Sequence, residues 1–237
     1  MNSYKEQEEK TKESYNNYSP YNEDKWHECV GLTIQEFLHN YLDEIDLTNK
    51  VILNAGSGGE CYNIQKDMIH LDLVENNIKN FPFHIQASIT NIPLYNDSVD
   101  IIICVGSVIN YTNAEIAISE FNRILKKNGI LILEFERSDS ADLLFNKKHH
   151  QDKVNMTYFY QNNEHFLTLY SEKYILNLIK NNSFSILRKK RFHTLSSFFV
   201  RLGLSENKAA KYIKFDKIFY PFSNQLAHNV IMIAKKN

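Results

Sequence analysis

Five short, mostly apolar runs in the middle of the chain constrain its fold most strongly. They lie at residues 51–53, 68–73, 83–85, 101–105 and 130–135. Strands buried on both faces of a parallel sheet read as continuous apolar runs, whereas strands with one solvent face alternate between apolar and polar residues. A polar or helical stretch follows each run. This β-α repetition predicts a doubly wound α/β sheet with right-handed crossovers.

The rest of the sequence indicates one domain, with an N-terminal arm and two inserted segments. Residues 1–22 are polar and Tyr-rich, and we expect a flexible arm that can fold over a ligand as a lid with Tyr15, Tyr18 and Tyr21. The domain itself is expected over 23–237, with two further strands near 184–192 and 229–234 that bring the sheet to seven. Residues 138–170 form an insertion with a hairpin, and residues 194–219 hold two helices. Both additions are expected to cover the substrate.

Two helices are expected beside the sheet. Residues 24–45 carry apolar side chains at the spacing of one helical face. A second helix precedes the fifth apolar run. Thr112 or Asn113 is its expected N-cap, and Asn128-Gly129 its expected end.

Composition excludes several classes of protein. Hydrophobic residues make up 43% of the chain and charged residues 23%, which is typical of a globular domain and not of a disordered chain. The 3 Cys lack CxxC spacing, which argues against a disulfide framework and a cysteine zinc site. No apolar run is long enough to cross a bilayer. We therefore expect a cytoplasmic protein with no membrane partner.

A glycine-rich turn follows the first run directly, in the sequence Leu53-Asn54-Ala55-Gly56-Ser57-Gly58. Glycines allow a sharp bend there and let a ligand approach backbone N–H groups. Asp72 ends the next strand, close to the spacing of roughly 20 residues at which a carboxylate accepts hydrogen bonds from ribose hydroxyls. The two features together predict a ligand that contains adenosine, bound at the carboxyl ends of the strands.

Two adenosine cofactors compete for this turn. The NAD pattern GxGxxG needs Gly or Ala at position 61, where the chain has Cys61. The stretch before the second strand is also short, which leaves little room for the helix whose N-terminus would hold a pyrophosphate. S-adenosylmethionine carries no phosphate and needs no such helix. It is the preferred cofactor, with an NAD-linked oxidoreductase as an alternative.

Four stretches resemble the core of class I S-adenosylmethionine-dependent methyltransferases. Residues 54–58 are similar to their glycine-rich motif, and residues 70–73 to the acidic end of their second strand. Residues 86–100 are similar to their segment from the third strand to the fourth, and residues 123–131 to their helix-to-fifth-strand turn. The resemblance implies a Rossmann-like methyltransferase fold with a seven-stranded, mostly parallel sheet and S-adenosylmethionine as cofactor.

The same resemblance implies a set of cofactor-binding residues. Gly56 and Gly58 would lie against the methionine part, Asp72 at the ribose and Leu73 on adenine. Ser88 and Ile89 would line the adenine edge, and Val105 would close the floor. The full set is Asn54, Ala55, Gly56, Ser57, Gly58, Asp72, Leu73, Ser88, Ile89 and Val105.

Three residues depart from the family pattern. Asn54 replaces an acid, Glu60 replaces a third glycine, and Ser88 replaces an aspartate near the adenine amine. These departures support a second alternative, a non-catalytic regulatory or scaffold relative.

The stretch after the fourth strand, residues 105–111, limits the methyl acceptor. It lacks the prolines found there in families that methylate amino groups of nucleic acid bases. Gly106 and Ser107 stand where a metal-dependent catechol enzyme has carboxylates, so no metal is expected. The basic excess at 188–217 is interpreted as a solvated face rather than a nucleic acid site. A small-molecule acceptor, methylated on oxygen or nitrogen, is the remaining expectation.

Tyr111 and His165 are the candidate catalytic residues. Tyr111 follows the fourth strand on the cofactor side and can orient the acceptor. His165 lies among aromatic residues of the hairpin, and histidine can act as a general base near neutral pH. Glu134 and Glu136, at the end of the fifth run, are further candidates for a base.

Overall fold

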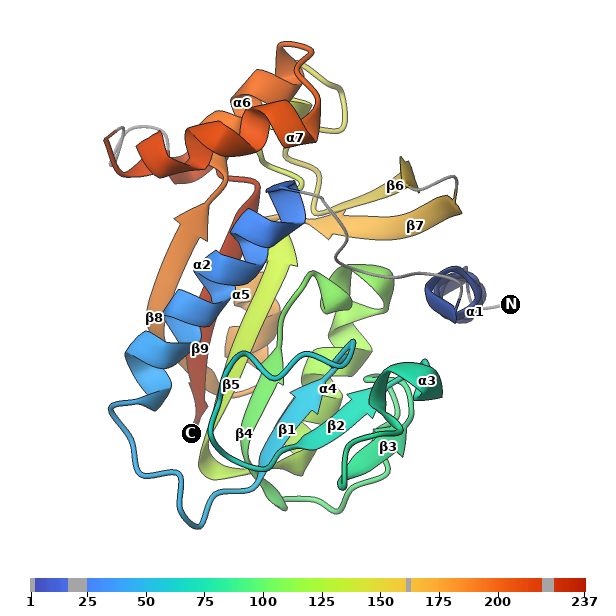
Figure 1. The fold of residues 1–237 in the computed structure, drawn as a ribbon, viewed down its shortest axis with the longest axis vertical. Coiled ribbons are helices and arrows are strands. Elements are labelled where there is room, and N and C mark those ends of the chain that lie inside the picture. Colours follow the sequence, from blue (N-terminus) through green and yellow to red (C-terminus); the bar gives the residue numbers. More distant parts are fainter. Residues whose placement is uncertain (1–2, 17–24, 161–162, 219–223) are drawn as a thin grey trace.

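A seven-stranded sheet forms the centre of the molecule in the computed structural model, which describes residues 3–16, 25–160, 163–218 and 224–237 (Figure 1). The strand order is β3-β2-β1-β4-β5-β9-β8. The first five strands in the chain are parallel, and β9 is antiparallel to both β5 and β8. The strands span β1 Ile52–Ala55, β2 Ile69–Asp72, β3 His84–Gln86, β4 Val99–Cys104, β5 Leu125–Glu136, β8 Phe184–Phe192 and β9 Asn229–Lys236. The predicted α/β architecture is confirmed.

Helices cover both faces of this sheet, which explains the unbroken apolar runs (Figure 1). In β4, Ile102 packs with α4 and α5 on one face, whereas Ile101 and Ile103 pack with α2 on the other. Successive strand residues point to opposite faces, so both sets must be apolar. The helices are α2 Lys25–Leu42, α3 Glu75–Ile78, α4 Ala114–Ile124, α5 Glu172–Asn181, α6 Thr194–Arg201 and α7 Glu206–Ala209, with 3₁₀ segments η1 Val108–Tyr111, η2 Ala141–Leu143, η3 Ala210–Ile218 and η4 Asn224–Leu226.

Helix α4 begins as the sequence predicted and ends earlier. Asn113 is its N-cap, because the side-chain oxygen accepts hydrogen bonds from the N–H groups of Glu115 and Ile116. The predicted end at Asn128-Gly129 was wrong, since Leu125 already pairs with Val99 as the first residue of β5. Residues 126–129 instead form a tight bend, in which a Cβ on Gly129 would lie 2.8 Å from the carbonyl oxygen of Lys126.

Residues Ser3–Asn16 form a helix, α1, where the sequence suggested a flexible arm. The Gln7 side chain holds α1 in place by donating hydrogen bonds to the carbonyl oxygens of Asn110, at 3.2 Å, and Phe166, at 3.1 Å. Phe166 belongs to the hairpin of β6 Lys153–Tyr160 and β7 Asn163–Tyr170, which the sequence predicted. Tyr18 and Tyr21 of the expected arm lie outside the described residues.

The segment between β1 and β2, residues 56–68, consists of turns and contains no helix along its length, all of which is described. The glycine turn is therefore not followed by a helix N-terminus, in line with the short stretch noted in the sequence. Within the described ranges, no helix is long and apolar enough to span a membrane.

Candidate functional site

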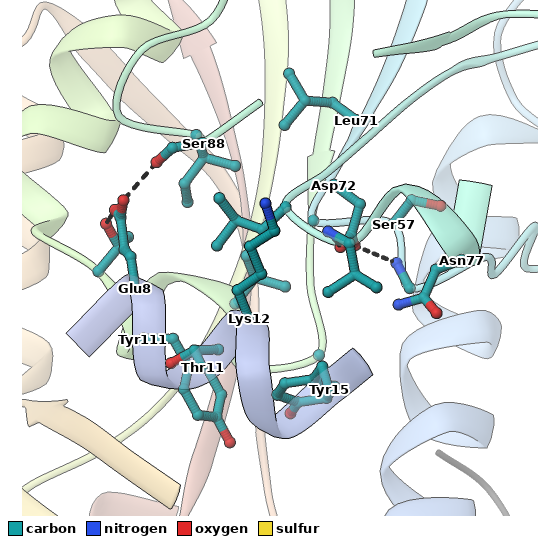
Figure 2. A pocket seen from close by; sticks show the side chains of 18 of the residues that line it. Glu8, Thr11, Lys12, Tyr15, Ser57, Leu71, Asp72, Asn77, Ser88 and Tyr111 are labelled. Atoms are coloured by element: carbon teal, nitrogen blue, oxygen red, sulfur yellow. Dashed lines mark hydrogen bonds between the residues drawn. The ribbon is translucent and has the colours of Figure 1, made fainter. Parts of the chain in front are cut away.

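A cavity of about 140 Å³ lies at the carboxyl edge of the sheet, between the loops that follow β1 to β4 and the helix α1 (Figure 2). Most of the residues predicted to bind the cofactor line it: Gly56, Ser57, Gly58, Asp72, Leu73, Ser88, Ile89 and Val105. Tyr111 lines it as well. Parallel strands place their following loops at one edge, so residues far apart in the sequence meet there.

The two glycines of the turn serve different purposes. Both have a positive φ, +74° at Gly56 and +56° at Gly58, which side-chain-bearing residues rarely adopt. A Cβ on Gly56 would lie 2.3 Å from Cγ1 of Val108, so this position must stay bare for the loops to pack. A Cβ on Gly58 would meet no atom within 4 Å. Gly58 therefore presents bare backbone to the open space of the cavity.

Asp72 is held rigidly at the cavity wall. Its Oδ2 accepts a hydrogen bond from the N–H of Gly58 at 2.8 Å, and its Oδ1 accepts one from the N–H of Val74 at 2.8 Å. Burial raises the pKa of this carboxyl above its ordinary value, although the amide donors oppose the shift. Each oxygen keeps a lone pair for a ligand donor. The side chain thus joins the glycine turn to the end of β2 and still offers acceptors to the cavity.

Asn54 and Ala55 do not line the cavity, in contrast to the prediction for them. Asn54 is buried, and its Nδ2 donates to the carbonyl oxygen of Glu60 at 2.7 Å. Ala55 is fully buried in the core on the α4 side. Ser57 lines the cavity, but its hydroxyl is 2.7 Å from Nδ1 of His70, behind the turn. The side chains of Asn54 and Ser57 therefore stabilise the glycine turn from the side that faces away from the cavity.

Tyr111 and His165 both contact one aromatic ring from α1. The ring of Tyr15 meets the ring of Tyr111 edge-on at 5.9 Å and that of His165 at 5.7 Å. Tyr15 lines the cavity, whereas His165 is buried and does not. Burial lowers the pKa of His165, so its imidazole is neutral near pH 7.

Helix α1 contributes four cavity residues, of which the sequence suggested only Tyr15. Glu8, Thr11 and Lys12 were missed. With Tyr15 they have the spacing i, i+3, i+4 and i+7, which places them on one face of a helix. A search for apolar periodicity overlooks this face because it is mainly polar. Figure 2 shows their side chains directed from α1 toward the loops of the sheet.

Glu134 supports the cavity floor from below without lining the cavity. Its Oε2 accepts hydrogen bonds from the N–H groups of Gly106, at 2.9 Å, and Ser107, at 2.7 Å, both in the left-handed region. Its Oε1 accepts one from Nδ2 of Asn229 at 2.8 Å. Complete burial raises the pKa of Glu134 to about 7. Glu136 also lies off the cavity wall, with its carboxylate 3.6 Å from His228.

Residues 50–133 match a family model described as a methyltransferase domain. A relative in Methanocaldococcus jannaschii, an uncharacterized protein, is 31% identical over 136 residues. That match covers 49% of this chain and 60% of the relative, so the chain spans less than two thirds of the relative's length.

Solved structures share the fold at low sequence identity. Magnesium protoporphyrin IX methyltransferase from Synechocystis PCC 6803, solved with bound S-adenosylmethionine, has a TM-score of 0.58 and 12% identity over 100% of this chain and 98% of its own. A Burkholderia thailandensis 1,6-didemethyltoxoflavin-N1-methyltransferase, solved with S-adenosylhomocysteine and 1,6-didemethyltoxoflavin, has a TM-score of 0.54 and 12% identity over 88% of this chain and 78% of its own. The fold is that of a Rossmann-like methyltransferase. This fold agrees with the one that the sequence predicted, and the family match places a methyltransferase domain over residues 50–133.

Proposed function

We propose that this protein is a methyltransferase that uses S-adenosylmethionine and methylates an oxygen or nitrogen of a small-molecule acceptor. The observation that carries the proposal is the hydrogen bond from the N–H of Gly58 to the carboxylate of Asp72. Both residues line the cavity at the carboxyl edge of the sheet. A carboxylate at the end of β2 is placed to accept hydrogen bonds from the two ribose hydroxyls of an adenosine.

The residues present fit this cofactor. Gly58 and Gly106 both line the cavity, and a Cβ on either would meet nothing within 4 Å, so both leave room for a ligand. Leu73, Ile89 and Val105 supply apolar surface for a base. The turns at residues 56–68 provide no helix N-terminus for a pyrophosphate, which favours S-adenosylmethionine over NAD.

S-adenosylmethionine, when bound, supplies an electrophilic methyl group on a positively charged sulfur. The tasks left to this chain are to orient the acceptor, to exclude water and to receive the proton that the acceptor loses. We assign the orientation of the acceptor to Tyr111, which lines the cavity. We assign the acceptance of the proton to His165, whose lowered pKa keeps its imidazole neutral. The ring of Tyr15 contacts that of His165 and lines the cavity, which His165 does not, so this assignment requires the Tyr15 ring to move and expose His165.

The segments added to the sheet are consistent with a small-molecule acceptor. The segments expected to cover the substrate, residues 138–170 and 194–219, contribute β6, β7 and α6, which project beyond the carboxyl edge of the sheet (Figure 1). The Burkholderia thailandensis methyltransferase described above, which has the same fold, was solved with 1,6-didemethyltoxoflavin bound. Both observations support a small-molecule acceptor rather than a polymer, and no described residue of 138–170 or 194–219 lines the cavity itself.

Calorimetry with S-adenosylmethionine and S-adenosylhomocysteine tests the proposal. We expect the wild type to bind both and Asp72→Ala to lose most of the affinity, because the ribose hydroxyls lose their acceptor. Asp67→Ala is the matched control, since Asp67 is exposed and lies off the cavity wall. Failure of the wild type to bind either compound, or full affinity in Asp72→Ala, would overturn the proposal.

A further inference from the structure

We infer that Glu8 of helix α1 recognises the 6-amino group of the cofactor's adenine and so selects a 6-aminopurine over a 6-oxopurine. This inference rests on the proposed function, because it assigns a partner within the same cavity. It gives a covering helix a direct part in ligand recognition.

Three hydroxyl groups converge on one oxygen of the Glu8 carboxylate. Oε1 of Glu8 accepts hydrogen bonds from the hydroxyls of Ser88, at 3.0 Å, and Thr90, at 3.3 Å, and from the hydroxyl of Thr112. The Ser88 and Thr90 hydroxyls are also 2.7 Å from each other, and the N–H of Thr90 donates to Ser88 Oγ at 3.1 Å. The loop after β3 is therefore organised to hold this carboxylate in one orientation.

The other oxygen of the carboxylate is left to accept a further hydrogen bond. Among the residues that the structure describes, Oε2 of Glu8 has no hydrogen-bond partner, and Glu8 lines the cavity wall. The cavity lining is mixed: Thr11, Lys12 and Thr112 are polar or charged, whereas Leu73, Val74, Ala87 and Ile89 have apolar side chains. A ligand bound here displaces water from the carboxylate, and the lost hydrogen bond is costly unless the ligand itself donates one.

The order of the strands indicates which part of the ligand faces Glu8. Ser88 and Thr90 follow β3, Asp72 ends β2, and the glycine turn follows β1, so the three features lie in that order across the sheet. Figure 2 shows Glu8 and Ser88 on one side of the cavity and Asp72 on the other. With the ribose at Asp72 and the methionine part at the glycine turn, the base extends toward β3. The 6-amino group is the hydrogen-bond donor that adenine has and hypoxanthine lacks.

Calorimetry with two ligands that differ at this group tests the inference. S-adenosylhomocysteine carries a 6-amino group, and S-inosylhomocysteine carries a 6-oxo group instead. A hydrogen bond to a charged acceptor predicts that the wild type prefers the adenosyl compound at least about tenfold. In Glu8→Gln the side-chain NH₂ can face the ligand, so the preference should fall to about one or reverse. Glu9→Gln, an exposed position on the same helix, is the matched control and should keep the preference.

Each contrary result is distinguishable. If Glu8→Gln loses affinity for both ligands equally, Glu8 only holds α1 in position. If the preference for the adenosyl compound is unchanged, another group recognises the 6-position of the base. Either result overturns the inference and leaves the proposed function standing. Failure of the wild type to bind either nucleoside overturns the proposed function itself. Ser88→Ala, which removes one hydroxyl that orients Glu8, should reduce the preference without abolishing it.

Discussion

At the scale of single residues, Glu134 couples the stability of the fold to pH. The pKa of its buried carboxyl is raised from 4.5 to about 7. Between these two values the folded protein holds the proton and the unfolded chain has released it, so raising the pH favours unfolding. This contribution of Glu134 to stability is present below about pH 4.5 and is lost as the pH rises to 7.

We predict that Glu134→Gln removes this dependence. The free energy of unfolding of the wild type should fall relative to the variant by roughly 3 kcal/mol between pH 4.5 and 7. Gln can still accept from the N–H groups of Gly106 and Ser107 through its one oxygen. Its NH₂ then faces Nδ2 of Asn229, and the Asn229 amide must turn over so that Oδ1, which has no partner among the described residues, accepts instead. Urea unfolding across this pH range measures the effect, with exposed Glu75→Gln as control. Parallel pH profiles for the wild type and Glu134→Gln would contradict the prediction.

Residues whose role depends on the backbone were predictable from the sequence. Gly56, Gly58 and Asp72 lie where expected because a tight turn and a strand-end carboxylate restrict the residue type. Asn54 and Ala55 belong to the same motif but are buried, because adjacent side chains of β1 point to opposite faces of the sheet and helices or turns cover both faces. No local sequence pattern pointed to Glu8, because its hydrogen-bond partners Ser88 and Thr112 lie far away in the sequence.

At the scale of elements, the strands and α4 were predictable and α1 was not. Apolar periodicity locates helices that bury an apolar stripe, whereas α1 faces the cavity with Glu8, Thr11 and Lys12. Its position depends on tertiary hydrogen bonds from Gln7, which no local pattern reveals. The cover of the site was therefore the least predictable part of the molecule.

We predict that Gln7→Ala loosens α1 and leaves the rest of the fold intact. The variant loses two hydrogen bonds to the carbonyl oxygens of Asn110 and Phe166, which should raise the opening of the helix roughly tenfold. Limited trypsin digestion after Lys10 and Lys12 should be faster by that factor, while the urea midpoint stays unchanged. Glu9→Ala, exposed on the same helix, serves as control. Equal digestion rates for wild type and variant would show that other contacts hold α1.

At the scale of the whole molecule, ligand binding should stabilise the fold, because the cavity joins the loops after β1 to β4 with α1. S-adenosylhomocysteine at about a hundred times its Kd contributes about 2.7 kcal/mol. For a chain of 237 residues this raises the Tm by roughly 5–10 °C. Thermal unfolding followed by circular dichroism measures the shift. Asp72→Ala at the same concentration should show almost none, and a wild type without a shift would contradict the prediction.

The antiparallel course of β9 has a practical consequence for experiments on this protein. The strand begins at the ligand edge of the sheet and ends at the opposite edge, where Lys236 pairs with Asp97 (Figure 1). A biotin or affinity tag attached after Asn237 would anchor the molecule to a sensor surface with the cavity turned toward solution. The same tag placed before α1 would instead attach the surface next to the helix that covers the cavity.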